Sequence, residues 1–339
     1  MRKAVDQSYD ILIEPGLLSS AADMLSGRFG RGAYAVITDS NVAEKYAEPL
    51  AGSLAAAGCS RVEVVTIPAG EASKTRQIKE EVEDSLFSSG LGRDSFIVAV
   101  GGGVVGDLAG FVAATYARGV PFVQVPTTLL SMIDSSVGGK TGVDVPWGKN
   151  LVGAFHQPSL VLIDPLVLNS LPEEQFVSGM AEAVKHGVIS DRELFRFIEE
   201  HLREILSLSP EILTVLIERN CAIKAGVVGR DERESNLRQI LNFGHTLGHA
   251  VEALSGFRLL HGQAVAVGMI LEAGLSEGMG LFPAEDARCL ERLLDALGLP
   301  VKLKLKGVSA LRILEHTHLD KKARSGRARY ALPRRIGEM

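Results

Sequence analysis

The sequence predicts a parallel α/β fold in the first half of the chain and a mostly helical fold in the second. Short β-branched runs alternate with helical patterns up to Asp164, and long apolar periodic stretches dominate after it. The chain has 339 residues, about twice the usual domain length of roughly 150, so two domains are expected. We place the boundary near Leu171, which gives domains 1–171 and 172–339.

The first half contains five expected strands, each short and rich in β-branched residues: 33–38, 62–67, 96–100, 122–125 and 159–163. Helices are expected from about Asn41 to Gly58, from about Ser73 to Ser89, and after the glycine loop that follows 96–100. Strands that alternate with crossover helices form a parallel sheet covered on both faces. The glycine loop after 96–100 is what makes nucleotide binding the expected role of this domain.

The second half carries helix signals almost throughout. Pro172, Pro210 and Pro283 stand where helices are expected to start. The periodic apolar stretches predict helices over roughly 173–189, 191–207, 211–228, 236–255, 262–279 and 284–297.

Composition excludes several classes of protein. The formal charge is −5 with cations interspersed among acids, so the chain lacks the basic face that nucleic acid requires. No uncharged stretch reaches the roughly 18 residues of a membrane helix, and the amino terminus has no apolar run typical of a signal peptide; we therefore expect a cytoplasmic protein. Three cysteines without short spacing predict buried free thiols rather than disulfides.

The loop after the third strand reads Gly101-Gly-Gly-Val-Val-Gly-Asp107 and fits G-x-G-x-x-G between a strand and a helix. Such a loop lets backbone amides approach a pyrophosphate at the positive end of a helix. The pattern alone is weak, because a dinucleotide fingerprint also has an acid about 20 residues on, at the end of the next strand. This chain has Thr127 and Thr128 there instead.

Charged residues follow two other expected strands. Asp39 ends the first strand, and Glu71 with Lys74 follows the second. Ligands of open α/β sheets bind at the carboxyl ends of the strands, so these residues are candidate contacts. The alternative is that each belongs to a tight turn or a helix cap.

Three histidines within 17 residues, His245, His249 and His261, favour a metal or catalytic site over satisfied core residues. On a helix, His245 and His249 share one face. The metalloprotease motif is excluded because Thr246 stands where its general base would be. A carboxylate could complete a three-ligand set, and Glu182 is the candidate; the alternative is a surface ion pair between Glu182 and Lys185.

Several cations are spread singly and together suit a small anion that carries carboxylate and phosphate: Lys140, Lys149, Lys185, Lys224 and Arg238. Taken singly, each of them is more typical of a surface cation than of an anion site. The basic run from Lys321 to Arg329 is either a solvated loop or an anion site.

Together these motifs resemble the 3-dehydroquinate synthase family, in order over nearly the whole chain. The quoted segments are Gly101–Asp107, Ala114–Gly119, Pro126–Thr128, Asp134–Lys140, Gly179–Lys185, Asn242–His249, His261-Gly262 and Asp320–Lys322. The resemblance implies a dimeric cytoplasmic enzyme of the shikimate pathway, which supplies chorismate and the aromatic amino acids. It also implies NAD and zinc or cobalt as cofactors, and a small phosphorylated keto acid as substrate.

The resemblance implies roles residue by residue. Glu182, His245 and His261 would hold the metal while His249 faces the substrate, which corrects the pairing of His245 with His249. The cofactor contacts would be Asp39, Glu71, Lys74, Gly102, Gly103, Asp107, Thr127, Thr128, Lys140, Lys149 and Ser170. The substrate contacts would be Arg118, Asp134, Lys140, Asn150, Lys185, Lys224, Arg238, Asn242, His249 and Lys322, among which Lys140, Lys185, Arg238, Asn242 and His249 would be catalytic. Lys321 is the alternative to Lys322, and Asn169-Ser170 departs from the family's Lys-Thr.

The implied reaction converts 3-deoxy-D-arabino-heptulosonate 7-phosphate to 3-dehydroquinate and phosphate. A hydroxyl is oxidised, phosphate is eliminated, the ketone is reduced again, and an internal aldol step closes the ring. Three alternatives stay open. A polyol dehydrogenase resembling glycerol dehydrogenase has no need of Lys140, Lys185, Lys224 and Arg238; another sugar phosphate cyclase needs no carboxylate partner; and a non-catalytic nucleotide sensor has no need of the metal residues.

Overall fold

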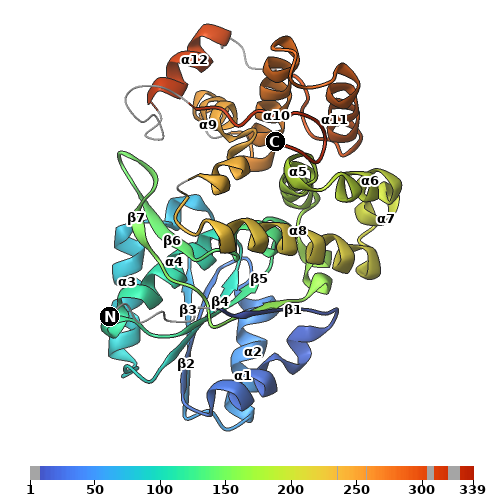
Figure 1. The fold of residues 1–339 in the computed structure, drawn as a ribbon. Helices are drawn as coiled ribbons and strands as arrows, with labels where there is room; N and C mark the ends of the chain where they lie inside the picture. Colours follow the sequence, from blue (N-terminus) through green and yellow to red (C-terminus); the bar gives the residue numbers. More distant parts are fainter. Residues whose placement is uncertain (1–7, 235, 257, 304–308, 320–328) are drawn as a thin grey trace, which may run out of the picture. The chain divides into compact units, whose positions relative to one another are not determined.

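The computed structural model describes residues 8–234, 236–256, 258–303, 309–319 and 329–339. The chain divides into two compact units, Met1–Ser170 and Leu171–Met339. Figure 1 traces the first in blue to green and the second in yellow-green to red. Each unit is described by itself.

The first unit is built on a parallel sheet of six strands with the order β1-β8-β5-β4-β2-β3. The five expected strands are confirmed, and β1 is an addition. Its four residues pair with β8 at the edge, a run too short to show an alternating pattern. The strands are β1 (Asp10–Ile13), β2 (Ala33–Asp39), β3 (Arg61–Ile67), β4 (Phe96–Gly101), β5 (Phe122–Pro126) and β8 (Leu160–Ile163).

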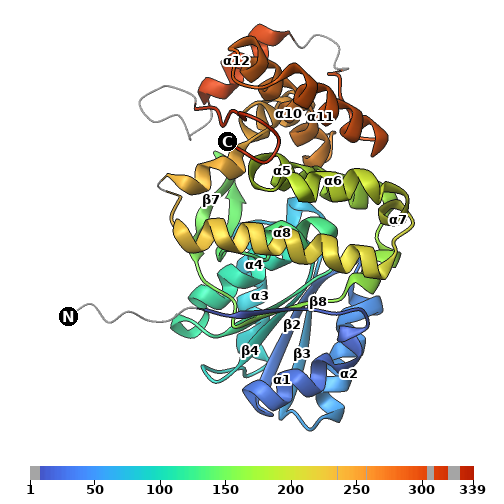
Figure 2. The same ribbon diagram turned by 45° about the vertical axis from the view of Figure 1, so that its right-hand side comes forward.

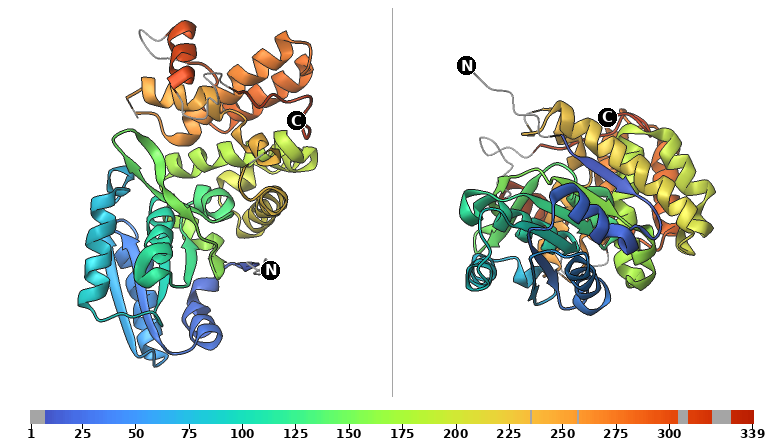
Figure 3. Two further views of the ribbon diagram at one scale, coloured as in Figure 1. Left: turned by 60° about the vertical axis from the view of Figure 1, so that its left-hand side comes forward. Right: turned by 90° about the horizontal axis from the view of Figure 1, so that it is seen from below.

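Helices cover both faces of this sheet, as Figure 3 shows. The helices α1 (Ala21–Phe29) and α2 (Glu48–Ala56) pack on the face that carries Tyr34 and Val36. The helices α3 (Arg76–Ser88) and α4 (Gly103–Thr115) pack on the other face, against Ala35 and Ile37. Side chains of β2 therefore alternate between two cores. Short helical turns complete the unit: η1 (Leu17–Ser20), η2 (Ala43–Ala47), η3 (Glu71–Ser73), η4 (Tyr116–Arg118), η5 (Ser131–Ser135) and η6 (Pro165–Ser170).

An antiparallel hairpin of β6 (Lys140–Val145) and β7 (Gly148–Phe155) was not expected from the sequence. Its segment contains Gly142, Gly148 and Gly153, and glycine weakens a strand signal. The hairpin packs on α4 so closely that a Cβ at Gly110 would lie 2.5 Å from Cγ2 of Thr141. Glycine in α4 is what permits this packing.

The described part of the second unit consists of helices and connecting segments, which confirms the expected fold class (Figure 2). Two expected helices are divided: the chain breaks at His201, and again at Gly244, whose φ of 76° ends helical geometry. The helices are α5 (Glu173–Ser190), α6 (Arg192–Glu200), α7 (Leu202–Leu206), α8 (Pro210–Arg230), η7 (Leu237–Asn242), α9 (His245–Leu254), α10 (His261–Gly278), α11 (Ala284–Ala296) and α12 (Ala310–Leu319).

Two composition-based expectations can be compared with the described residues. No helix there is both long and apolar enough to cross a membrane. All three cysteines are free thiols; Cys221 is buried as expected, whereas Cys59 and Cys289 are partly exposed.

Candidate metal and cofactor sites

The order of the strands defines where a ligand fits in the first unit. The strands β3 and β4 lie on opposite sides of β2, so the chain changes direction across the sheet between β2 and β4. The order 3-2-4-5-8 follows the flavodoxin-like plan, in which ligands bind outside the carboxyl ends of the strands at this point. Asp39 ends β2, Gly102 follows β4, and Thr127 follows β5. The topology brings these predicted residues to one sheet edge.

The glycine loop gives α4 its close approach to the sheet. Gly102 is the residue before α4, and a Cβ there would lie 3.1 Å from Cγ2 of Thr128. A Cβ at Gly106 would lie 2.7 Å from Oε1 of Gln124 on β5. The third glycine thus serves helix–strand packing, and the amides at the start of α4 remain at the sheet edge, as in dinucleotide-binding loops.

Lys74 is a buried cation surrounded by carboxylates. Its Nζ lies 2.5 Å from Oδ2 of Asp107. Burial lowers the pKa of the Lys74 ammonium, but Asp107 and Glu71 outweigh it, and the net pKa is raised. Partial burial raises the pKa of Glu71, which Lys74 and Lys149 oppose; Nζ of Lys149 lies 3.8 Å from Oε1 of Glu71. Four predicted cofactor residues therefore form one charge network.

Three hydroxyl groups near this edge have no hydrogen-bond partner among the described residues: Thr38, Thr127 and Ser135. Thr38 is fully buried beside Asp39, and Oγ of Ser135 lies 3.1 Å from where a Cβ on Gly103 would be. Buried hydroxyls normally find a partner, so these atoms fit contacts with a polar ligand. Sequence reasoning identified Thr127 and missed the other two, since a lone Thr or Ser carries no motif.

Other predicted residues of the first unit lie apart from this edge or are already engaged. Arg118 is exposed after the far end of α4, about 20 Å along the helix from Gly103. The Ser170 hydroxyl lies 2.8 Å from the Tyr46 hydroxyl. The Asn150 amide donates to Oδ1 of Asp144 on the hairpin, which also carries Lys140. Asp134 lies in η5, beside Ser135.

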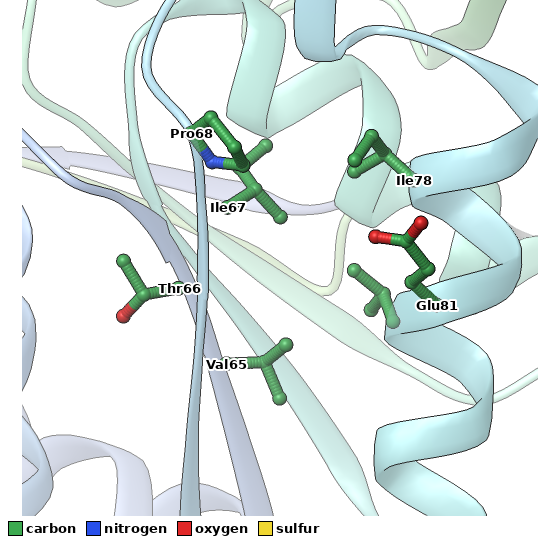
Figure 4. A pocket seen from close by; sticks show the side chains of 7 residues that line it. Val65, Thr66, Ile67, Pro68, Ile78 and Glu81 are labelled. Carbon is green, nitrogen blue, oxygen red and sulfur yellow. The ribbon is translucent and has the colours of Figure 1, made fainter.

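A small pocket of about 150 Å³ lies between β3 and α3. Figure 4 shows the side chains that line it, including Ile67, Ile78 and Glu81. None of the predicted site residues lines this pocket. We assign it no role.

In the second unit, Glu182, His245 and His261 converge from three helices, α5, α9 and α10. Their candidate ligand atoms all lie within 4.8 Å of one another. Oε1 of Glu182 lies 3.5 Å from Nε2 of His245 and 3.4 Å from Nε2 of His261. Two nitrogen or oxygen ligands about 2.0–2.1 Å from a tetrahedral zinc lie roughly 3.3 Å apart, so these spacings fit one bound ion.

The protonation of the cluster also suits a metal. Burial alone would raise the pKa of the Glu182 carboxyl, but Lys185 and His245 outweigh it and hold that pKa well below its usual range. Burial lowers the pKa of His245 far below its ordinary value, although Glu182 opposes this. Nδ1 of His245 lies 3.1 Å from the Phe243 carbonyl oxygen, which can only accept, so Nδ1 carries the hydrogen. The Nε2 lone pair then faces the negatively charged Glu182 carboxylate, and the two repel each other. A cation bound between them would remove this repulsion.

Glu182 is fully buried, and neither of its oxygens has a hydrogen-bond donor in suitable geometry among the described residues. Lys185, also buried, forms an ion pair with it. A surface ion pair, the alternative interpretation of this segment, is therefore wrong. One ion pair does not use all the lone pairs of this buried carboxylate, and a divalent metal would take up those that remain.

His249 belongs to a second, overlapping set with Glu252 and His261. The rings of His249 and His245 are 5.4 Å apart between centroids. The helical spacing correctly places both histidines on one side of α9, but Glu182 joins His245 and not His249. His249 remains beside the cluster, where the resemblance places a substrate contact.

Three predicted substrate cations of this unit are buried: Lys185, Lys224 and Arg238. They come from α5, α8 and η7, which pack against one another. Lys and Arg are almost never buried without an anionic partner or ligand. Asp231 fixes η7 by accepting the Arg238 amide at 3.0 Å, and Asn242 donates to Oε1 of Glu234 at 2.8 Å. Lys321 and Lys322 lie outside the described residues.

Comparison with known proteins identifies the family. The family model described as 3-dehydroquinate synthase N-terminal matches residues 64–178, and that described as 3-dehydroquinate synthase C-terminal matches residues 179–323. The chain belongs to the 3-dehydroquinate synthase family. A 3-dehydroquinate synthase from Geobacter metallireducens is 50% identical over 337 residues, which cover 98% of this chain and 92% of the relative.

Two solved structures of synthases share the fold of this chain. A 2-epi-5-epi-valiolone synthase from Streptomyces hygroscopicus subsp. jinggangensis 5008, with NAD+ and Zn2+ bound, superposes with a TM-score of 0.88 at 31% identity, covering 100% of this chain and 93% of that one. A 2-deoxy-scyllo-inosose synthase complexed with carbaglucose-6-phosphate, NAD+ and Co2+ gives 0.89 at 29% identity, covering 97% and 90%.

Proposed function

We propose that this protein converts 3-deoxy-D-arabino-heptulosonate 7-phosphate to 3-dehydroquinate and phosphate in the shikimate pathway. The observation that carries the proposal is the buried Glu182–His245–His261 cluster in a chain of the 3-dehydroquinate synthase family. The reaction is redox-neutral overall: one hydroxyl is oxidised and later restored, and phosphate leaves together with one proton from the neighbouring carbon. The protein would thus be a phosphate-eliminating carbon–oxygen lyase.

Bound NAD would supply reversible redox chemistry, and bound zinc or cobalt would supply a Lewis acid for a substrate oxygen. In the second unit, Glu182, His245 and His261 would hold the metal. His249 would face the substrate, close enough to the cluster to accept or donate a proton at a ring nitrogen. The donor set and its spacing support the metal roles, and the family resemblance supports the role of His249.

The buried cations would hold and orient the substrate. Lys185, Lys224 and Arg238 lie on three packed elements and would bind its carboxylate and phosphate oxygens. Because they are shielded from water, they would also stabilise negative charge that develops when the carbon–oxygen bond breaks. Lys322 is a proposed further contact, as are Arg118, Asp134, Lys140 and Asn150 of the first unit.

The first unit would bind NAD. Amides at the start of α4 would meet the pyrophosphate, and the Asp39 carboxylate at the end of β2 would accept hydrogen bonds from a ribose. Thr127 offers a buried hydroxyl without a partner in the described part of the chain. We also propose that the protein works as a homodimer in the cytoplasm, as the family resemblance implies.

The activity is tested by following phosphate release and nicotinamide absorbance in one reaction with metal-loaded protein. We expect one phosphate per carbocycle formed while NADH never accumulates, because oxidation and reduction occur within one cycle. Glycerol serves as the competing substrate. Stoichiometric NADH from glycerol, with the phosphorylated acid left intact, would indicate a dehydrogenase and overturn the proposal.

A further inference from the structure

Glu272 on α10 is a fully buried carboxylate that contacts the helix carrying two of the three histidines. Resting on the metal site proposed above, we infer that Glu272 is a positioning residue for that site. It fixes the first turn of α9 and thereby the direction in which His245 points.

Two hydrogen bonds of Glu272 go to the start of α9. Its Oε2 accepts the Gly244 amide at 2.8 Å, and its Oε1 accepts the Leu247 amide at 3.1 Å. These are the amides of the residue before the helix and of the third helical residue. In a capping box the helix's own side chains satisfy the same two donors. Here one carboxylate from another helix satisfies both.

The sequence at the start of α9 explains why the cap comes from elsewhere. Gly244 has no side chain, and its φ of 76° together with its surroundings excludes one: a Cβ would lie 2.5 Å from Cγ of Met269 and 2.9 Å from the Val265 carbonyl oxygen. Leu247 is apolar. Because α9 and α10 cross closely, no side chain fits at Gly244 to cap α9. The same crossing places Glu272 where its carboxylate can act as the cap.

The two amides bracket the metal ligand in the chain. His245 is the first residue of α9, so its backbone is held between Gly244 and Leu247. The hydrogen bond from its Nδ1 to Phe243 then directs Nε2 toward Glu182. His261 is the first residue of α10, the helix that carries Glu272. One carboxylate thus ties together the two helices whose first residues are the histidine ligands.

The test compares Glu272→Gln with the wild-type protein by chelator competition for zinc and by the visible absorption of bound cobalt. An amide keeps the shape but turns one acceptor into a donor facing a backbone N–H. We expect zinc to bind about 10–100-fold more weakly, as when partners of metal ligands are removed elsewhere, and the cobalt spectrum to change. Asp286→Asn is the control, because Asp286 is another buried carboxylate that accepts an amide, that of Ile336 at 2.8 Å.

The control should lose thermal stability but bind zinc and cobalt as the wild type does. His261→Ala, in the same titration, separates the two proposals: wild-type zinc affinity in His261→Ala would refute the metal site itself. If His261→Ala loses zinc while Glu272→Gln keeps wild-type affinity and cobalt spectrum, the positioning role is overturned. Should Glu272→Gln fail to fold, Glu272→Asp replaces it, and an unchanged cobalt spectrum there would equally overturn the inference.

Discussion

The two candidate sites of this protein handle charge differently. In the helical unit Glu182 and Lys185 are at most 1% exposed, and Lys224 and Arg238 are also buried. At the sheet edge of the α/β unit the carboxylates are only partly buried: Glu71 retains 45% of its side-chain exposure, and Asp39 accepts the Asn41 amide at 2.8 Å. Exposure to solvent, the Asn41 amide and the cations Lys74 and Lys149 offset much of the charge there.

This difference indicates what each site needs from its ligand. In the helical unit the charges are shielded from water, so the free energy of a metal or an anion bound beside them depends strongly on each one. At the sheet edge most charged groups already have partners or solvent. The hydroxyls of Thr38 and Thr127 have no hydrogen-bond partner among the described residues and could bind a ligand. We therefore expect substitutions in the helical unit to have the larger effects.

The largest effect is expected at the metal ligands. His261→Ala removes one of three ligands, so zinc affinity should fall more than about 100-fold, beyond the effect of losing a ligand's partner. His249→Ala is the matched control, because it lies beside the cluster but outside the set that includes Glu182. Metal content of both purified variants, measured after dialysis, checks this. Full metal in His261→Ala, or its loss in His249→Ala, would reassign the ligands.

The buried cations come next. Lys185→Met and Arg238→Ala should each slow phosphate release by about 10²–10³-fold, because each removes a cation from a site that water does not screen. Arg196→Ala is the control, since that exposed cation pairs with Glu193 at the surface and should leave the rate unchanged. Rates are compared in variants of verified metal content. If either buried cation can be removed without loss, the anion-binding role is wrong.

Much of the fold could be predicted because apolar periodicity is a local signal. The strand from Ala33 and the helix from Pro210 begin where the pattern puts them. The hairpin of β6 and β7 could not be predicted, because the need for Gly142 and Gly153 appears only once the two strands lie against each other. The break at Gly244 has the same cause: the residue is required by contact with α10, which the local sequence does not reveal.

The metal-site residues could be predicted where several reactive side chains lie close together in the sequence. The histidines drew attention to α9, and Glu182 stood out because it and Lys185 are the only charged residues in the apolar segment 177–189. Spacing alone paired His245 with His249, since the position of α10 relative to α9 is a tertiary property. No sequence pattern marks Glu272, Thr38 or Ser135. The role of a single acid or hydroxyl depends on its neighbours in the folded structure, which the sequence does not show.

The smallest effects are expected at the sheet edge, where Asp39→Asn should have opposite consequences with and without NAD. With cofactor, the loss of a charged acceptor should weaken NAD and reduce the preference for NAD over NADP, because Asp39 disfavours a 2′-phosphate by like charge. Calorimetric titration of both nucleotides checks this. Equal affinities in the wild-type protein would contradict the placement of Asp39.

Without cofactor, the same substitution should stabilise the protein slightly at neutral pH. Burial raises the pKa of Asp39, although the amides of Asn41 and Val42 partly offset it. The folded chain then binds more protons at this group than the unfolded chain, so wild-type stability falls as the pH rises from about 4, the ordinary aspartate pKa, through the raised value. Asp39→Asn lacks this loss and should gain less than about 1 kcal/mol at pH 7 and nothing at pH 3. Urea unfolding across that range measures the difference. If the free energy of unfolding rises by the same amount at every pH, the Asp39 charge does not oppose folding. Burial of that charge would then not be a cost that a bound ligand could relieve.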